Sequence, residues 1–492
     1  MEAVKVLSQL KEVKNYLRTV FNHCISSVNP KTLVSNELLV QNGELIVRGI
    51  NYKLMRNCYL VGFGKGVVDM AAAACVALEG HLQKGMLSIP EGTSHSLRGN
   101  IDVFEGAKNN IPDEKAEKAA KNIVKLVTSL SENDNLIIMI TGGGSALLPY
   151  PIPPVTLKEK LELTNLLQKR GAPIVELNAV RRKLSLVKGG KLAKLAYPAQ
   201  VISLILSDIV GDPLDSIASG PTVKDISSKY TSIEILKKYE LFDKIPNSVI
   251  EVLTKEDPED KEDYFINTRN YIIGNNSLAL TAAKEMTVKD GYVTQVLTNS
   301  LQGKVETVSL LLAKFSSLIC QALTKIVNKD TFLCEMEKLD TGLFISSDTV
   351  SELAEKLYSE PTNKLLLLFG GETSVEIKGN GKGGRNQELA LRFSTAVDEL
   401  AKTNHVLQLF NIVILCGGTD GLDGPTDAAG ALGYIGQTQC AEDQGLHFTN
   451  HIANNDSYTF FSKLNNGEDQ IKIGHTGTNV MDITMISIQS KI

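Results

Sequence analysis

Three glycines stand beside polar side chains in the stretch "EIKGNGKGGRNQELAL", residues 376–391. Gly379, Gly381 and Gly384 have the spacing G-x-G-x-x-G of a dinucleotide-binding turn. Such a turn is followed ~20 residues later by an acid at a strand end, whereas Asp398 and Glu399 fall in helix-like sequence. A dinucleotide turn, a plain glycine hairpin and an anion-binding loop are the three interpretations. The helix start "RNQE", with Arg385, Asn386, Gln387 and Glu388, favours the anion-binding loop.

Two further glycine turns follow apolar runs. "VGFGKG" places Lys65 between two glycines, and "TGGGSALL" carries Gly142, Gly143, Gly144 and Ser145. Neither is a Walker A loop, because G-x-x-x-x-G-K-[ST] is absent. Several N–H donors at a helix start favour a phosphate or carboxylate ligand at "TGGGS". Tight strand–helix packing explains only one or two of those glycines, and Lys65 alone is equally well a solvated helix start.

Charged residues cluster in the next two segments. In "LSDIVGDPLDSIASGPT", Ser207 and Asp208 directly follow an apolar strand, where a general base or a metal ligand belongs. Asp212 and Asp215 follow on the loop, where turn chemistry explains them equally well. In "LNAVRRKLSLVKGGKLAKLA", the side chains on roughly one helical face are those of Asn178, Arg181, Lys188 and Lys191. This face is either a solvated basic surface or the partner of an acidic ligand.

The second half has polar turns of the same kind. "FGGETSVEI" contains Gly371, Glu372 and Thr373, and "CGGTDGLDGPTDAAGA" contains Thr419, Asp420, Gly421, Asp423 and Asp427. "HTGTNVMDI" adds a polar turn from Thr476 to Asn479. Carboxylates combined with backbone amides suit Mg²⁺ and phosphates, and Asp208 and Glu372 are the candidate metal ligands.

The elements that must position these residues alternate between apolar strands and helices. This pattern predicts an α/β fold with a mostly parallel sheet, in which ligands bind beyond the carboxyl ends of the strands. At 492 residues two domains are expected. The charged connector "KEDPEDKED" (255–263) sets the predicted domains at 1–265 and 266–492, with an insertion at 325–363.

Composition excludes several classes of protein. A hydrophobic content of 43% with a net charge of −5 from well-mixed charges indicates an ordinary globular chain without a nucleic-acid or membrane partner. The seven dispersed cysteines predict reduced thiols, and no zinc pattern is present. With no leader and no run of ~20 apolar residues, a cytoplasmic location is expected. Mitochondrial import without a cleaved leader is the alternative.

Five sequence blocks, taken in order, closely resemble the MOFRL-type, or class II, glycerate kinases. They are "TGGGSALL", "LSDIVGDPLDSIASGPT", "GGETSVEIKGNGKGGRNQELAL", "GTDGLDGPTDAAGA" and "TGTNVMDI". The similarity runs from the first helix almost to the C-terminus. Asn109 and Asn110 stand where we would expect a His-Pro pair, so this chain offers no histidine there.

The resemblance implies a Rossmann-like N-terminal domain, a smaller C-terminal α/β domain and an active site in the cleft. It implies ATP- and Mg²⁺-dependent phosphorylation of D-glycerate, on the 2-hydroxyl, which feeds serine and fructose breakdown into glycolysis. Lys65, Asp208 and Arg385 align with polar positions in the catalytic cleft. Glycerate and nucleotide phosphates would be bound by the "TGGGS", "GGET" and "GGRNQE" turns.

Two other functions are compatible with parts of the sequence. An NAD(P)H-dependent hydroxypyruvate or tartronate reductase would share the hydroxy-acid substrate and the G-x-G-x-x-G spacing, but the ribose-binding acid and a His/Asp proton relay are missing. A catalytically silent metabolite-binding protein is opposed by the retained lysine, aspartate and arginine. As a kinase, the chain should lose turnover by orders of magnitude in Lys65→Ala and Arg385→Ala, each with an intact fold.

Overall fold

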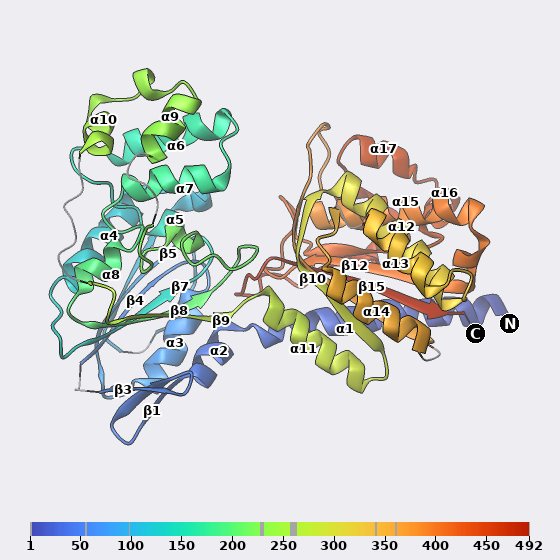
Figure 1. Ribbon diagram of the computed structural model, residues 1–492, viewed down its shortest axis with the longest axis horizontal. Helices are drawn as coiled ribbons and strands as arrows, with labels where there is room; N and C mark the ends of the chain where they lie inside the picture. Colours follow the sequence, from blue (N-terminus) through green and yellow to red (C-terminus); the bar gives the residue numbers. More distant parts are fainter. Residues whose placement is uncertain are drawn as a thin grey trace. The chain divides into compact units, whose positions relative to one another are not determined.

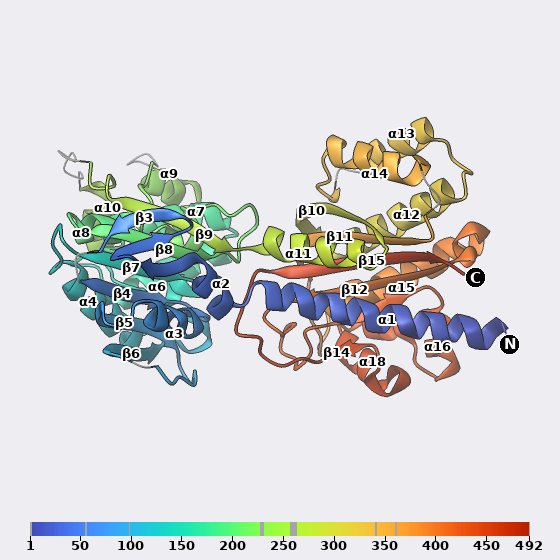
Figure 2. The same ribbon diagram turned by 90° about the horizontal axis from the view of Figure 1, so that it is seen from below.

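The computed structural model describes residues 2–54, 57–97, 99–226, 231–255, 263–339, 342–359 and 362–491. The chain divides into two compact units (Figures 1 and 2). We call Asn29–Asn275 the N-terminal unit, and Met1–Val28 together with Asn276–Ile492 the C-terminal unit. The predicted α/β class with two domains is confirmed.

The division differs from the predicted bounds of 1–265 and 266–492. The first helix, α1 (Glu2–Ser27), belongs to the C-terminal unit, and the strand β9 (Thr268–Gly274) belongs to the N-terminal unit. As a result the two units are nearly equal in length. Most of the connector 255–263 lies outside the described residues.

The N-terminal unit is built on a six-stranded sheet whose strand pairs are all parallel, in the order β6-β5-β4-β7-β8-β9. Counted along the chain this is 3-2-1-4-5-6, the order of a dinucleotide-binding Rossmann sheet. The strands are β4 (Cys58–Phe63), β5 (Leu82–Pro90), β6 (Ile101–Gly106), β7 (Asn135–Ile140), β8 (Gln200–Leu206) and β9. β7 is buried along its whole length, as expected for a parallel strand covered on both faces.

Helices pack on both faces of this sheet (Figure 1). They are α2 (Pro30–Glu37), α3 (Val67–Ala77), α4 (Glu114–Val127), α5 (Gly144–Leu147) and α8 (Lys191–Ala196). A separate helical cluster has its own apolar core and comprises α6 (Leu157–Lys169), α7 (Ile174–Lys183), α9 (Thr231–Lys238) and α10 (Asn247–Thr254). A small antiparallel sheet is formed by β1 (Leu38–Gln41), β2 (Glu44–Val47) and β3 (Ile50–Lys53).

The C-terminal unit has a mixed sheet in the order β10-β11-β15-β12-β13-β14, in which only the β10–β11 pair is parallel. Its strands are β10 (Val293–Lys304), β11 (Lys364–Ser374), β12 (Phe410–Gly418), β13 (Gly430–Tyr434), β14 (Gln470–Ile471) and β15 (Asp482–Ser490). β15, from the end of the chain, therefore lies between β11 and β12.

Helices cover both faces of the mixed sheet (Figure 2). α1 packs with α11 (Asn276–Lys289), and α12 (Val305–Leu323) packs with α15 (Arg385–Thr403). The remaining helices are α13 (Lys329–Leu339), α14 (Ser347–Ser359), α16 (Gln437–Asp443), α17 (Phe448–Ala453) and α18 (Ser457–Lys463). α13 and α14 occupy the predicted insertion 325–363 and pack on α12; their origin as an insertion stays a prediction.

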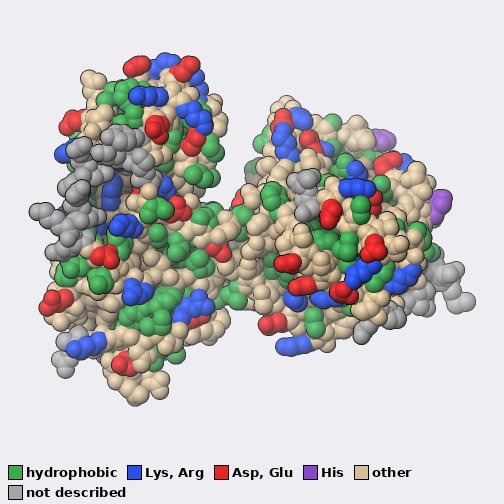
Figure 3. Space-filling model, viewed as in Figure 1, with side chains coloured by type: hydrophobic (Ala, Val, Ile, Leu, Met, Phe, Trp, Pro, Cys, Tyr) green, Lys and Arg blue, Asp and Glu red, His purple; other side chains and the backbone are tan. Residues whose placement is uncertain are grey.

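One described helix, α12, is long and apolar enough to cross a membrane, which corrects the expectation that no segment would be. Its apolar window is 67% buried within the protein. Leu312, Phe315 and Ile319 are fully buried in the core of the C-terminal unit, so the burial is that of a core helix. On the face in Figure 3, basic and acidic side chains are interspersed on each unit.

Candidate active site

Two of the predicted glycine turns meet at the point where the strand order of the N-terminal unit reverses, between β4 and β7. The Lys65 amide donates to the Gly142 carbonyl at 2.9 Å, and the Gly66 amide donates to Thr141 Oγ1 at 3.0 Å. A Cβ on Gly64 would lie 2.2 Å from Thr141 Oγ1, so only glycine allows this approach. The carboxyl ends of neighbouring parallel strands at such a reversal are where α/β proteins bind ligands.

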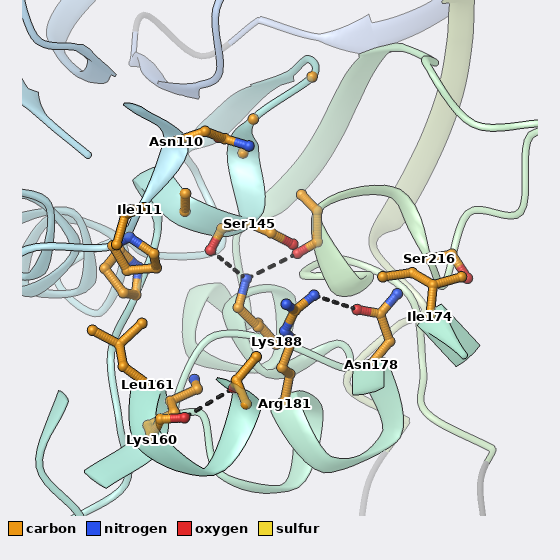
Figure 4. A pocket seen from close by; sticks show the side chains of 18 of the residues that line it. Asn110, Ile111, Ser145, Lys160, Leu161, Ile174, Asn178, Arg181, Lys188 and Ser216 are labelled. Carbon is orange, nitrogen blue, oxygen red and sulfur yellow. Dashed lines mark hydrogen bonds between the residues drawn. The ribbon is translucent and has the colours of Figure 1, made fainter. Parts of the chain in front are cut away.

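A pocket of about 490 Å³ opens beside the second turn (Figure 4). The predicted site residues that line it are Gly142, Gly143, Gly144, Ser145, Asn178, Arg181, Lys188 and Asp208. Lys65 lines an adjoining cavity, which shares Asn110 with the pocket. The structure thus brings together most of the residues that the sequence of this unit singled out. Asn109 and Asn110, which replace the expected His-Pro, both line the Lys65 cavity.

Basic side chains form the floor of the pocket. Lys188 is fully buried, and its Nζ donates to the carbonyls of Ser145 at 3.1 Å and Ala218 at 3.2 Å. Burial lowers the pKa of Lys188 well below its usual value, and nearby Lys160 and Arg181 lower it further. Burial also lowers the pKa of Arg181, although a guanidinium keeps its charge in proteins. A pocket with buried positive charge favours an anionic ligand.

Hydrogen bonds fix the polar side chains around this floor. Arg181 Nη1 donates to Asn178 Oδ1 at 3.4 Å, and Ser219 Oγ donates to the same oxygen at 3.3 Å. Ser219 also shares a 3.0 Å hydrogen bond with Ser145. Asn178 therefore orients Arg181 and, through Ser219, the first turn of α5.

The three aspartates after β8 have different roles. Asp208 lines the pocket, whereas Asp212 accepts a 2.6 Å hydrogen bond from Asn275, and Asp215 lies 3.8 Å from Arg182. Ser207, also predicted as a binding residue, is fully buried, and its amide donates to the Gly274 carbonyl on β9. Of these three aspartates, Asp208 is the one that lines the pocket.

In the C-terminal unit, Arg385 is held between two carboxylates. Its Nε and Nη2 donate to the two oxygens of Asp482 at 2.6 and 2.9 Å, and Nη1 lies 3.0 Å from Glu372. Burial lowers the pKa of Arg385, but Asp482 and Glu372 outweigh it, and the net shift is upward. Asp482 begins β15, opposite Gly371 on one neighbour and Gly418 on the other. This register places one aspartate beside both glycine turns.

The N-terminus of α15 already holds an anion from the protein itself. The Asn386 and Gln387 amides donate to the Asp423 carboxylate at 3.0 and 2.9 Å, and Gln387 Nε2 adds a third bond at 3.0 Å. Burial raises the pKa of Asp423 to about 6, although these amides oppose the shift. The sequence predicted that these N–H groups would receive a substrate anion. The structure instead gives them an internal partner.

The G-x-G-x-x-G spacing likewise has a packing origin. Cβ atoms on Gly379 and Gly381 would lie within 2.5 Å of the backbone of Asn454, and one on Gly384 would lie 2.2 Å from the Asp423 carboxyl carbon. Glu388 is buried between Arg392 and Asn455, with hydrogen bonds of 2.9 and 3.0 Å. The glycines thus allow close loop packing at the start of α15.

Several buried polar atoms near Arg385 have no hydrogen-bond partner among the described residues. They are Thr373 Oγ1, both side-chain polar atoms of Asn386, and Gln387 Oε1. Gly371, Thr373 and Asn386 line one small recess together with Asp482. Unsatisfied buried polar groups are rare in proteins and point to a bound water or ligand.

The remaining predicted residues of this unit connect two loops. Thr419 Oγ1 donates to the Met481 carbonyl at 2.7 Å and accepts from the Val480 amide at 2.9 Å. Asp420 and Asn479 accept hydrogen bonds from the nearby amides of Leu422 and Met481. The Gly421 amide donates to the Gly418 carbonyl at 3.1 Å. Their contacts here are structural, and a role in ligand binding stays a prediction.

The N-terminal unit could hold a magnesium ion only if the phosphates of the substrate supply part of its ligands. Among the described residues no three His, Cys, Asp or Glu side chains gather into a ready-made metal site. Mg²⁺, however, usually binds through one or two carboxylates plus substrate phosphates. Asp208 could supply that carboxylate. Glu372 is already paired with Arg385 at 3.0 Å, which makes it the weaker candidate.

The sequence reasoning missed two residues of these clusters. Asp482 was quoted within "HTGTNVMDI" without a role, because only the register of β15 reveals its partner. Lys160, on α6, lines the pocket with a fully buried amine. In the sequence Lys160 is one of several lysines on a charged helix, and no local pattern indicates that it is buried in a pocket.

Comparisons with known proteins agree with the resemblance noted in the sequence. Residues 365–482 match the model of the MOFRL family, and residues 16–254 match a domain described as of unknown function, DUF4147. A glycerate kinase from Danio rerio is 41% identical, over 95% of this chain and 96% of that protein. A D-glycerate 2-kinase from Thermotoga maritima is 34% identical, over 86% of this chain and 89% of the relative.

The fold gives the same result. The crystal structure of a glycerate kinase from Thermotoga maritima superposes with a TM-score of 0.76 at 30% identity, covering 97% of this chain and all of the other. Full-length relatives and a matching two-domain structure establish the assignment, and this chain belongs to the MOFRL-type, class II glycerate kinase family.

Proposed function

We propose that the protein transfers the γ-phosphoryl group of ATP to D-glycerate, at the 2-hydroxyl, with Mg²⁺ as the accompanying metal. Family membership supports this reaction. The observation that carries it is the pocket at the strand-order reversal, where a glycine turn, two buried lysines, Arg181 and Asp208 meet. Phosphoryl transfer depends mainly on positioning the reactants and compensating negative charge, and these groups supply both.

Two roles for Asp208 are compatible with its place at the end of β8. Its carboxylate could accept the proton of the attacking hydroxyl, or it could hold the metal. Mg²⁺, when bound, would neutralise charge on the phosphate oxygens. Lys65, on the adjoining turn, would do the same with its exposed ammonium.

The carboxylate of glycerate needs a cationic partner of its own. Arg385 uses three nitrogen atoms on Asp482 and Glu372, which leaves little for a substrate. Arg181 makes only a 3.4 Å bond to Asn178 and lines the pocket. Arg181 is therefore the better candidate of the two for a paired hydrogen bond to the carboxylate.

Incubation with ATP, Mg²⁺ and D-glycerate, followed by separation of the phosphoglycerate isomers by NMR, tests the proposal. The expected product is 2-phosphoglycerate. Formation of the 3-isomer would overturn the position, and no phosphorylated product would overturn the reaction. Steady oxidation of NADH with hydroxypyruvate would instead support the reductase. A cytoplasmic location stays a prediction.

A further inference from the structure

Lys160 is a buried lysine without a hydrogen-bond partner among the described residues. Its side chain lies on α6 and is 7% exposed, and its Nζ makes no hydrogen bond. Figure 4 shows it among the side chains of the pocket, near Leu161 and Arg181. Removing an ammonium from water without pairing it is costly, and lysines that serve only structure extend their amine to solvent or a partner.

The other cations around Lys160 already have partners. Lys188 Nζ donates to two carbonyls, and Lys191 Nζ donates to the carbonyls of Arg182 at 2.9 Å and Ser185 at 2.7 Å. Arg181 contacts Asn178. Asp208 is the one carboxylate among the residues that line the pocket. Lys160 is thus the unsatisfied donor in a pocket with excess positive charge.

We propose that Lys160 is a substrate-binding residue, whose ammonium donates to an anionic oxygen of a ligand in this pocket. The oxygen belongs either to the carboxylate of the hydroxy acid or to a phosphate of the nucleotide, which share this chemistry. The inference rests on the proposed function for the identity of the ligands. It adds a residue that neither the motifs nor the family resemblance assigned.

The charge state of Lys160 provides a signature of such binding. Burial lowers the pKa of Lys160 to about 7, and the neighbouring charges of Lys191 and Arg181 act in the same direction. An anion placed against the amine would favour its charged form and raise that pKa. Above neutral pH, binding should therefore take up a proton. A lysine with a purely structural role would give no such uptake.

The test compares the full-length native protein with Lys160→Met, which keeps the length of the side chain without its charge. D-glycerate and ADP are each titrated calorimetrically near pH 8 in two buffers of different ionisation enthalpy, which reports proton uptake. Lys158→Met is the matched control, because Lys158 lies on the same helix with an 86% exposed side chain.

We expect Lys160→Met to weaken the binding of one of the two ligands at least tenfold and to abolish the proton uptake that accompanies that binding. The other ligand should stay within twofold of native, and Lys158→Met should bind both normally. Weaker binding of glycerate would identify its carboxylate as the partner of Lys160. Weaker binding of ADP would identify a phosphate as that partner. Because the substitution replaces a buried amine that has no hydrogen-bond partner with an apolar side chain, its Tm should equal or exceed the native value.

Native affinity and native proton uptake for both ligands in Lys160→Met would overturn the inference, as would equal weakening of both. Turnover of ATP and glycerate by the native enzyme is measured separately. If turnover is absent while proton uptake depends on Lys160, the proposed function fails and this binding role stands. If turnover is present and Lys160→Met binds as native, only the role of Lys160 fails.

Discussion

Arg385 belongs to a polar turn of the C-terminal unit and also stabilises that unit. Its partner Asp482 has a side chain only 6% exposed. We expect Arg385→Ala to lower the free energy of unfolding by about 3 kcal/mol, because it leaves a buried carboxylate unpaired. Urea unfolding measures this loss. The sequence alone predicted an intact fold for this variant, and the ion pair with Asp482 changes that expectation.

Two companion variants separate stability from catalysis at this position. In Arg385→Ala/Asp482→Ala the unpaired carboxylate is gone, so part of the lost stability should return. Lys65 is exposed, and Lys65→Ala should lose turnover by at least about a hundredfold with a native Tm. An Arg385→Ala variant as stable as Lys65→Ala would contradict the structural role.

The pKa of Lys160 predicts a pH dependence of stability. The folded-state pKa is about 7 and the unfolded value is about 10.4, so between them the unfolded chain binds a proton that the folded chain lacks. Stability then rises with pH. Lys160→Met should be more stable than native near pH 7, and the difference should shrink by up to about 1.4 kcal/mol per pH unit toward pH 10.

Urea unfolding of native and Lys160→Met at several pH values between 7 and 10 gives this difference directly. Groups far from residue 160 titrate alike in both proteins and cancel, whereas Lys188 loses the lowering effect of Lys160 on its pKa in the variant. Parallel stability curves across the range would show that the lysine is charged in the folded protein throughout.

At the scale of elements, the N-terminus of α15 depends on Asp423. Asp423→Ala removes the acceptor of two backbone amides and of Gln387 Nε2. We expect a loss of about 1–3 kcal/mol, from a lost helix cap and unsatisfied buried donors. Thermal unfolding measures it. Asp427→Ala, an exposed aspartate of the same loop paired with Lys472, is the control and should unfold like native.

How much the sequence could predict differs between elements. Apolar runs that end in glycine turns identified the strands β4, β7 and β8 and the turns that follow them, because these signals are local. The strand order that brings Lys65 beside Gly142 depends on pairing between distant segments. Similarly, Asp423 and Asn386 are 37 residues apart, and no local signal shows that this aspartate occupies the N-terminus of α15.

Residues with the same local sequence can also differ in burial alone. Lys158 and Lys160 both lie in "LKEKLELTNLLQK", yet one is exposed and the other fully buried. Their positions in the folded protein distinguish them, because Lys160 lines the pocket and Lys158 does not. The candidate site could therefore be predicted as a set of glycine turns with their flanking charges, but not as a pocket with a particular cationic floor.

At the scale of the whole molecule, the two ends of the chain fold together. α1 buries Leu17, Val20, Phe21 and Cys24 completely, and the amine of Lys14 lies 2.7 Å from Asp469 in the C-terminal unit. A Cβ on Gly417 of β12 would lie 2.6 Å from the Phe21 ring. The N-terminal helix is thus part of the core formed mainly by the last two hundred or so residues, a grouping that sequence order does not show.

Deletion of residues 2–28 should consequently destabilise the C-terminal unit and spare the N-terminal one. Exposing a buried apolar side chain costs about 1.5–3 kcal/mol, so the loss of four approaches the whole stability of a typical domain. Amide hydrogen exchange should show β12 and β15 losing protection, while β7 and β8 keep theirs. A peptide of residues 1–28 added in trans should restore protection in β12 and β15, because the missing contacts are those of α1. Native protection of β12 in the truncated chain would mean that the C-terminal unit folds without its first helix.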